Sequence, residues 1–429
     1  MTLPVILQGP VTIVRDFKQC PRAGASSGMP EALHLPTGAE ALLIALATPS
    51  PQGPRGIPVL LWGRPGVGKS SFIEGLAGPG LTVTTLIASI HDPTDFSGLP
   101  FLQDGGVHYA SPEWVEDFRK TEDGILFLDE LSTAPPSVQA ALLRVVFERK
   151  VGFTPLPDGV RIVAAANPPD LMVGGWDLSP PLRNRFVHLD WDISEALYLR
   201  SLSQGWASAT LPSIDAAAHA ALLPEWKIRV GGFLRIRPEA LHGNPEEDLF
   251  GFGSPRTWDF VCALLTSCEL LGYRLDTAST SEQQAILGLV RGCVGEATAL
   301  QLIEHLTNLR LPDPRAVLAG REKVDVGQLD DAELHVLFYG LNARLLPELE
   351  GEKLLPYSAV YLDLADRVFI DGRRDVIFVH LKELARAGWL ARVAAAGQSG
   401  SAGNYEEVMQ RIGSVFGDEA FNEFVNVLG

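Results

Sequence analysis

The sequence lacks the features that mark several classes of protein. Its 429 residues include only four cysteines, with no Cys-x-x-Cys pair, and its nine histidines are scattered, so we expect neither a disulfide framework nor a zinc site. The four thiols are typical of buried cysteines in a reducing cytoplasm. No apolar run reaches the roughly 18 residues that a membrane-spanning helix needs, and no basic stretch followed by an apolar core opens the chain. The sequence therefore predicts a cytoplasmic protein without a membrane segment or a signal peptide.

Positive charge is also scarce. Lys and Arg number 35 against 52 Asp and Glu, which gives a net charge of −17. This balance disfavours a general affinity for nucleic acid or for an anionic membrane, although it does not exclude a local basic pore. A protein is therefore the expected partner. Hydrophobic residues make up 46% of the chain, which is typical of a globular protein. The length predicts about two or three domains.

The strongest chemical signal is a glycine-rich stretch at residues 63–70, which reads G-x-x-x-x-G-K-S, a P-loop. The apolar run at 59–62 predicts a buried strand before it, and residues 71–77 predict a helix after it. The glycines would let backbone N–H groups close on phosphate oxygens, and the helix N-terminus would add partial positive charge. Lys69 is then expected to reach the β- and γ-phosphates of a nucleotide, and Ser70 to ligate Mg²⁺. A chance glycine loop is the alternative, and the flanking elements disfavour it.

Two carboxylates follow the apolar run at 125–128. Such a run predicts a central parallel strand, and the carboxyl ends of parallel strands form the ligand-binding edge of an open α/β sheet. Asp129 is therefore expected to hold Mg²⁺ beside the P-loop, and Glu130 to orient and polarise the attacking water. An acidic helix cap is the alternative. The predicted nucleotide-binding residues are Gly63, Arg64, Pro65, Gly66, Val67, Gly68, Lys69, Ser70, Ser71 and Asp129, with Ser70 and Asp129 as metal ligands.

Polar side chains stand at the ends of further predicted elements. A strand at 161–166 ends in Asn167, which would face the γ-phosphate and the water, with an Asn-Pro turn as the alternative. Arg183 and Arg185 precede the next strand, and surface arginines are the alternative there. Arg256 lies in the first turn of a helix, where its charge is mildly unfavourable. A nearby phosphate would explain Arg256, and so would a salt bridge.

Two hairpins are expected within this part of the chain. Residues 99–102 and 107–110 flank a Gln-Asp-Gly-Gly turn and predict a first hairpin. Residues 151–153 and 160–162 flank a turn with Pro, Asp and Gly and predict a second one. Helical periodicity predicts a helix between them, at 137–150.

These elements, in this order, resemble the AAA+ ATPases over about residues 30–270. Within that group the sequence is most similar to the MoxR family, including its CbbQ/NorQ-type members. The closer likeness lies in Asp95-Phe96-Ser97-Gly98, Glu148-Arg149-Lys150-Val151-Gly152, Ala165-Ala166-Asn167-Pro168, Arg185-Phe186 and Ser254-Pro255-Arg256. The resemblance implies that Lys69 and Ser70 are Walker A residues, Asp129 and Glu130 Walker B, Asn167 sensor 1, Arg185 the arginine finger with Arg183 as the alternative, and Arg256 sensor 2.

The resemblance also implies an assembly and a partner. Proteins of this kind form rings, usually hexamers, with ATP and Mg²⁺ bound between subunits, and they act like chaperones on a partner that carries a von Willebrand factor A domain. Two alternatives stay open: a nucleic-acid motor of the helicase or restriction type, and a nucleotide-gated scaffold with little hydrolysis. Salt-dependent DNA binding would indicate the motor, and nucleotide binding without turnover would indicate the scaffold.

The expected fold is α/β, a P-loop AAA+ parallel sheet flanked by helices, followed by an α-helical lid and a largely helical C-terminal extension. From residue 194 onward the pattern is helical, and the last part carries no catalytic constellation. A flexible link at 397–403 precedes an expected helical pair at 405–427. The predicted domains are an N-terminal segment at 1–30, the AAA+ α/β nucleotide-binding domain at 31–193, the helical lid at 194–270 and the helical extension at 271–429.

Overall fold

The computed structural model describes residues 35–398 apart from 54, 172–174, 207–208, 247, 249, 276–278, 309–311 and 349–351. The predicted segment at 1–30 and the helical pair at 405–427 lie outside these residues. The chain divides into two compact units. The N-terminal unit comprises Met1–Leu223 and Ala240–Ile303, and the C-terminal unit comprises Pro224–Glu239 and Glu304–Gly429.

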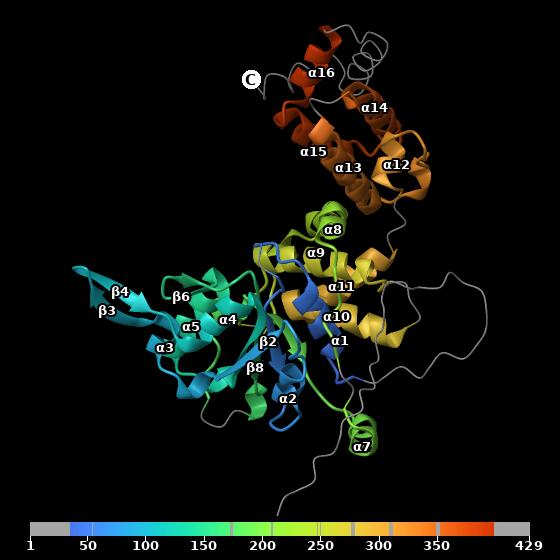
Figure 1. Cartoon of the computed structure of the whole chain (residues 1–429). Coiled ribbons are helices and arrows are strands. Elements are labelled where there is room, and N and C mark those ends of the chain that lie inside the picture. Colours follow the sequence, from blue (N-terminus) through green and yellow to red (C-terminus); the bar gives the residue numbers. More distant parts are fainter. Residues whose placement is uncertain are drawn as a thin grey trace, which may run out of the picture. The chain divides into compact units, whose positions relative to one another are not determined.

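The N-terminal unit is built around a parallel sheet of five strands, in the order β2-β5-β8-β1-β9. The strands are Val59–Trp62 (β1), Thr82–Ile87 (β2), Asp123–Asp129 (β5), Gly159–Ala166 (β8) and Val187–Asp190 (β9), and helices flank the sheet (Figure 1). All of β1 and nearly all of β5 and β8 are buried, because these apolar strands are covered on both faces. The predicted α/β fold class and the strands expected at 59–62, 125–128 and 161–166 are confirmed.

One face of the sheet packs against α4 (Glu113–Thr121) and α5 (Pro136–Glu148). Successive residues of a strand point to opposite faces, and Leu60, Leu126 and Ile162 all point to this one. They form one core with Phe118 of α4 and Leu142 of α5. The helix predicted at 137–150 is confirmed as α5, with slightly different ends.

Helix α10 (Thr280–Val294) packs against β9 and against α1 (Ala39–Ala47). A Cβ atom on Gly292 would lie 2.2 Å from the carbonyl oxygen of His188, so glycine permits this close approach of helix and strand. Arg291 of α10 also pairs with Asp190 of β9. The predicted boundary at residue 270 assigned α10 to the C-terminal extension, whereas the compact N-terminal unit includes it.

Two antiparallel hairpins extend from the N-terminal unit. β3 (Leu99–Gln103) pairs with β4 (Gly106–Ala110), and Asp104 and Gly105 form the turn with φ angles of 49° and 79°, as a type I′ turn requires. This hairpin was predicted and is confirmed. The second prediction is wrong in its return strand, because β6 (Lys150–Val151) pairs with β7 (Thr154–Pro155). Residues 160–162 instead lie in β8, where Val160 and Ile162 belong to the core of the sheet.

The remaining helices of the N-terminal unit are α2 (Lys69–Glu74), α3 (Pro93–Ser97), α6 (Pro180–Arg183), α7 (Glu195–Gln204) and α9 (Pro255–Leu270). Helices α8 (Ala216–Ile236) and α11 (Glu296–Asn308) each contribute residues to both units. Three free cysteines are buried in this unit, Cys262 and Cys268 in α9 and Cys293 in α10. Burial raises the pKa of Cys268 to about 12 and raises the pKa of Cys293 as well. The expectation of buried thiols is confirmed for these three residues.

The C-terminal unit is helical, as predicted. Its further helices are α12 (Pro314–Leu318), α13 (Asp331–Leu345), α14 (Leu354–Ile370), α15 (Arg374–Arg386) and α16 (Trp389–Gln398). Phe338, Tyr361 and Trp389, all fully buried, belong to its hydrophobic core. Within the described residues of the whole chain, no helix combines the length and the apolar character that crossing a membrane requires.

Candidate functional site

The glycine-rich loop at 63–68 connects β1 to α2, in the order that the sequence predicts. Gly66 and Gly68 have φ angles of 80° and 75°, which residues with a side chain seldom adopt. A Cβ atom on Gly63 would lie 2.5 Å from the carbonyl oxygen of Trp191, so this position requires glycine as well. The tight path of the loop therefore depends on glycine at each of these positions.

Lys69 begins α2, and its side chain folds back onto the loop. Its Nζ donates hydrogen bonds to the carbonyl oxygens of Gly63 at 2.5 Å and of Arg64 at 3.2 Å. Burial lowers the pKa of Lys69, against the opposing effect of the Asp129 and Glu130 carboxylates. The ammonium group thus lies at the carboxyl edge of the sheet, where phosphate oxygens could replace the two carbonyls as its acceptors.

Ser70 and Asp129 join the loop to the end of β5. Ser70 Oγ donates a hydrogen bond of 2.6 Å to Asp129 Oδ2. The two residues lie 59 positions apart in the sequence. They meet because the strands that precede them are parallel and end at the same edge of the sheet, as predicted. Hydroxyl and carboxylate oxygens are ligands that Mg²⁺ accepts in proteins, so this pair fits the metal that the sequence assigns to it.

Glu130 follows β5 in a left-handed backbone conformation, with a φ angle of 56°. Its side-chain Oε2 accepts a hydrogen bond from Ser89 Oγ at 3.3 Å, and its backbone N–H donates to Asp129 Oδ1 at 2.9 Å. Ser89 lies in the 3-10 helix Ala88–Ile90, which follows β2 at the same edge of the sheet. Ser89 was not predicted from the sequence, where its signal is a polar residue just after a strand rich in β-branched residues.

Asn167 lies beside the loop, at the end of β8. β8 and β1 run parallel with Ala166 opposite Trp62, and the N–H of Gly63 donates to the carbonyl oxygen of Ala166 at 3.3 Å. The N–H of Asn167 donates to Ser132 Oγ at 3.3 Å. The structure thus brings Asn167 to the same edge of the sheet as the glycine-rich loop and the two carboxylates.

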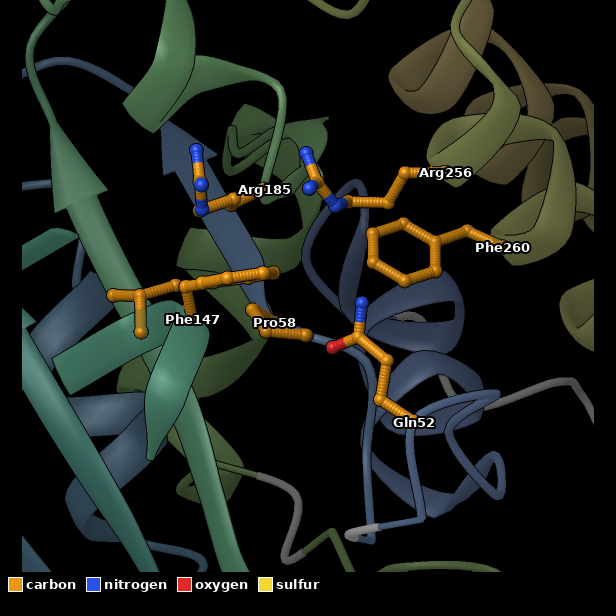
Figure 2. Close-up of a pocket in the computed structure, with 7 residues that line it drawn as sticks. Gln52, Pro58, Phe147, Arg185, Arg256 and Phe260 are labelled. Carbon is orange, nitrogen blue, oxygen red and sulfur yellow. The ribbon is translucent and has the colours of Figure 1, made fainter. Parts of the chain in front are cut away.

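Arg185 and Arg256 lie at the opposite edge of the sheet. Both line a small pocket with Phe147 and Pro58, and Figure 2 shows their side chains at this pocket. Pro58 directly precedes β1, whereas the glycine-rich loop follows it, and the four residues of β1 span about 13 Å. The two arginines therefore do not face the glycine-rich loop of their own chain.

The guanidinium groups of Arg185 and Arg256 share one aromatic neighbour. Their Cζ atoms lie 4.4 Å and 5.1 Å from the centroid of the Phe147 ring. Arg185 Nη1 donates to the carbonyl oxygen of Pro181, and Arg256 Nη1 donates to Asn184 Oδ1 at 3.3 Å. Burial, and then the positive charge of Arg256, lower the pKa of Arg185. Two neighbouring cations of this kind favour the binding of an anion.

Arg183 has a different environment. Only 8% of the residue is exposed, and its Nη1 and Nη2 donate to the carbonyl oxygens of Asp248 at 2.9 Å and Pro245 at 2.7 Å. Its guanidinium also lies 5.8 Å from the centroid of the Phe252 ring. Arg183 therefore holds a loop of its own chain, and of the two arginines considered from the sequence, Arg185 is the one that lines the pocket.

A buried histidine supports the strand that leads into the glycine-rich loop. Trp62 Nε1 donates to His188 Nδ1 at 2.9 Å, so Nδ1 is the acceptor and Nε2 carries the proton that it donates to the carbonyl oxygen of Arg183 at 2.9 Å. Burial lowers the pKa of His188 to about 4. A neutral imidazole thus ties β9 to β1, and periodicity alone gave no signal for this role.

Comparison with known proteins identifies the domain that carries these residues. Residues 58–186 match the family described as AAA domain (dynein-related subfamily). This stretch contains the glycine-rich loop, Asp129, Glu130, Asn167 and Arg185.

Individual relatives match over part of the chain. The Psp operon transcriptional activator of Escherichia coli K12 is 34% identical over 140 residues, which make up 30% of this chain and 42% of that protein. The chain thus spans less than half the length of this curated relative. The crystal structure of a candidate ATPase from Cytophaga hutchinsonii aligns with 64% of this chain and 90% of that one, at 17% identity and a TM-score of 0.38.

Proposed function

We propose that this chain, in which residues 58–186 form an AAA domain of the AAA+ ATPases, hydrolyses ATP with Mg²⁺ and uses the cycle to remodel a protein partner. The observation that carries the proposal is the 2.6 Å hydrogen bond between Ser70 and Asp129, with Lys69 and Glu130 at the same edge of the sheet. The residues to which we assign phosphate binding, metal binding and the orientation of water thus come from separate elements and lie at one edge of the sheet.

Each residue of this edge has a defined part in the proposed reaction. Lys69 would hold the β- and γ-phosphates, and Ser70 and Asp129 would hold Mg²⁺, which neutralises charge on the phosphates when bound. Glu130 would leave Ser89 and accept a hydrogen bond from the attacking water, whose oxygen bonds to the γ-phosphorus as the bond to the ADP oxygen breaks. Asn167 would orient the same water. The products are ADP and inorganic phosphate.

The arginine pair supports a composite site between subunits. Arg185 and Arg256 face away from the glycine-rich loop of their own chain, so a nucleotide that they contact has to belong to a neighbour. A repeated contact of this kind is heterologous, and it generates a ring when the rotation from subunit to subunit closes. We therefore propose a homo-oligomeric ring, a hexamer by resemblance to the MoxR family, in which Arg185 is the finger and Arg256 acts on the same neighbouring nucleotide.

The hairpin β3–β4 is the proposed contact with the partner. Leu99, Leu102 and Val107 are 63%, 81% and 61% exposed, and a ribbon of two strands is marginally stable without a partner. The ring of Tyr109 packs on that of Phe153 from the other hairpin, at 5.2 Å between centroids, which anchors the ribbon at its base. By resemblance, the partner carries a von Willebrand factor A domain. Residues 271–429 carry no catalytic constellation, so we propose that they bind this partner or organise the ring.

Hydrolysis is tested by phosphate release from the purified chain. We expect ATP to be hydrolysed with Mg²⁺ and the rate to fall to background with EDTA, because Ser70 and Asp129 offer oxygen ligands that only a hard divalent cation completes. Restoring Mg²⁺ should restore the rate. Nucleotide binding in both conditions without any phosphate release would favour the scaffold alternative instead.

Shortening the hairpin should separate hydrolysis from remodelling. Replacing residues 100–109 by a short glycine turn removes the exposed Leu102 and Val107 but no residue of the glycine-rich loop and neither Asp129 nor Glu130, so we expect the basal ATPase rate to stay within about twofold while partner activation is lost. ATPase rate, oligomer mass and partner activation are measured separately. The single change Leu102→Ser should also weaken partner activation, and Leu202→Ser, which changes another exposed leucine (67% exposed), is its matched control. Full partner activation by the shortened protein would show that the hairpin does not contact the partner as proposed.

A further inference from the structure

We propose that Phe147 is a positioning residue, which holds Arg185 and Arg256 as a pair that grips the terminal phosphates of a neighbouring subunit's nucleotide. The inference rests on the proposed action of these arginines between subunits. It concerns a residue that contacts neither the P-loop nor the carboxylates, and that carries no charge of its own.

The first observation is the shared ring. The Arg185 and Arg256 Cζ atoms lie 4.4 Å and 5.1 Å from the Phe147 centroid, both within the range of a cation–π contact. In Figure 2 the ring is seen edge-on, with the guanidinium group of each arginine above it. The two arginines come from distant parts of the sequence, and the Phe147 ring is a contact that both share.

The second observation is the charge of the pocket. Its described lining residues are Gln52, Pro58, Val146, Phe147, Arg185 and Arg256, with Phe260. None of these carries a carboxylate, and the pKa of Arg185 is lowered by burial and then by repulsion from the charge of Arg256. The negative face of an aromatic ring offsets part of that repulsion, but it cannot neutralise two cations. A polyanion, such as the terminal phosphates of a nucleotide, completes the site.

The third observation is how Phe147 itself is held. It lies in the last turn of α5, next to the buried residues Val145 and Val146, which fix that turn against the core. Phe147 is nevertheless 43% exposed, so burial in the core does not account for a large apolar side chain at this position. Its ring therefore lies at the surface, on a helical turn that is held by the core, rather than within the core itself.

The test compares aromatic with aliphatic replacements. We expect Phe147→Trp and Phe147→Tyr to keep kcat within a few-fold of the wild type, and Phe147→Leu and Phe147→Met to lower kcat about 10- to 100-fold, because misplaced arginines lose their alignment with the reacting phosphate. KM for ATP should change little, because Lys69 and its loop are untouched. Rings of the variants should also release ADP–aluminium fluoride faster when residue 147 is aliphatic.

Phe369→Leu is the matched control. Arg374 Cζ lies 4.4 Å from the Phe369 centroid in the C-terminal unit, and neither residue lines the pocket. This variant therefore removes an equally close cation–π contact without changing the arginine pair, and kcat of the assembled rings should not change. Oligomer mass is measured for every variant. A kcat that follows side-chain volume rather than aromatic character, among the variants that assemble, would overturn the proposal.

Arg185→Ala separates this inference from the proposed function. If Arg185→Ala keeps the wild-type rate, the proposed action of the arginine between subunits fails. If Arg185→Ala abolishes turnover while Phe147→Leu retains the wild-type kcat and holds ADP–aluminium fluoride normally, the proposed function stands and only the positioning role of Phe147 is wrong.

Discussion

Replacing Glu130 by Gln should leave ATP bound and lower its turnover at least about 100-fold, because the amide cannot accept the proton of the attacking water. The substitution preserves the shape of the side chain and an oxygen for the hydrogen bond with Ser89. Lys69→Ala, by contrast, should lose both binding and turnover, since the ammonium group lies against the glycine-rich loop, where the phosphates are expected. Binding of a fluorescent ATP analogue and release of phosphate are measured on the same preparations.

The control for Glu130→Gln is the same change at Glu116. That residue is on α4, where it pairs with Arg119 on the surface, so Glu116→Gln should hydrolyse ATP at the wild-type rate. Wild-type turnover by Glu130→Gln would show that the role given to Glu130 is wrong. Loss of nucleotide binding by Glu130→Gln would contradict the proposal that Lys69 binds the nucleotide while Glu130 acts only in its hydrolysis.

Mixing two inactive variants should restore part of the activity. Arg185→Ala subunits keep the P-loop, and Lys69→Ala subunits keep the finger, so some interfaces in a mixed ring recover both intact halves. With equal amounts and random assembly, half of the sites have an intact loop and half of their neighbours an intact finger, so about a quarter of interfaces are complete. ATPase rate is measured across mixing ratios, with subunit exchange confirmed by mass.

The control mixture combines Lys69→Ala with the double variant Lys69→Ala, Arg185→Ala, and it should stay inactive because no intact loop is present. A maximum in the rate near equal amounts is the expected signature of composite sites. Complete inactivity at every ratio, with mixed rings present, would count against action between subunits and would leave Arg185 as a residue of its own chain's fold.

Local sequence patterns predicted the arrangement of residues at the carboxyl edge of the sheet well. Gly63 to Ser70 form a motif whose glycines are required by the backbone, and Asp129 follows an apolar strand whose parallel neighbours bring its end to the P-loop. The hairpin at 99–110 was equally predictable, because Asp104 and Gly105 suit the turn that such a hairpin needs.

Longer-range features were less predictable. Residues 160–162 have the composition of a hairpin strand, but the apolar run that they begin continues to Ala166 and is stabilised by burial between β1 and β5. Spacing could not separate Arg183 from Arg185, because the difference comes from the carbonyl oxygens of a distant loop that hold Arg183. Ser89 gave little signal, since its bond to Glu130 exists only once β2 and β5 pair.

The burial of three cysteines makes the chain suitable for site-specific labelling. Cys262, Cys268 and Cys293 are at most 5% exposed, and the raised pKa values of Cys268 and Cys293 keep these thiols protonated, so thiol-reactive dyes should not modify them in the folded protein. With Cys20 replaced by Ser, a cysteine introduced at Leu102 would offer a reactive thiol on the hairpin. A dye at that position would report, as a change in fluorescence, whether the hairpin moves during each round of ATP hydrolysis.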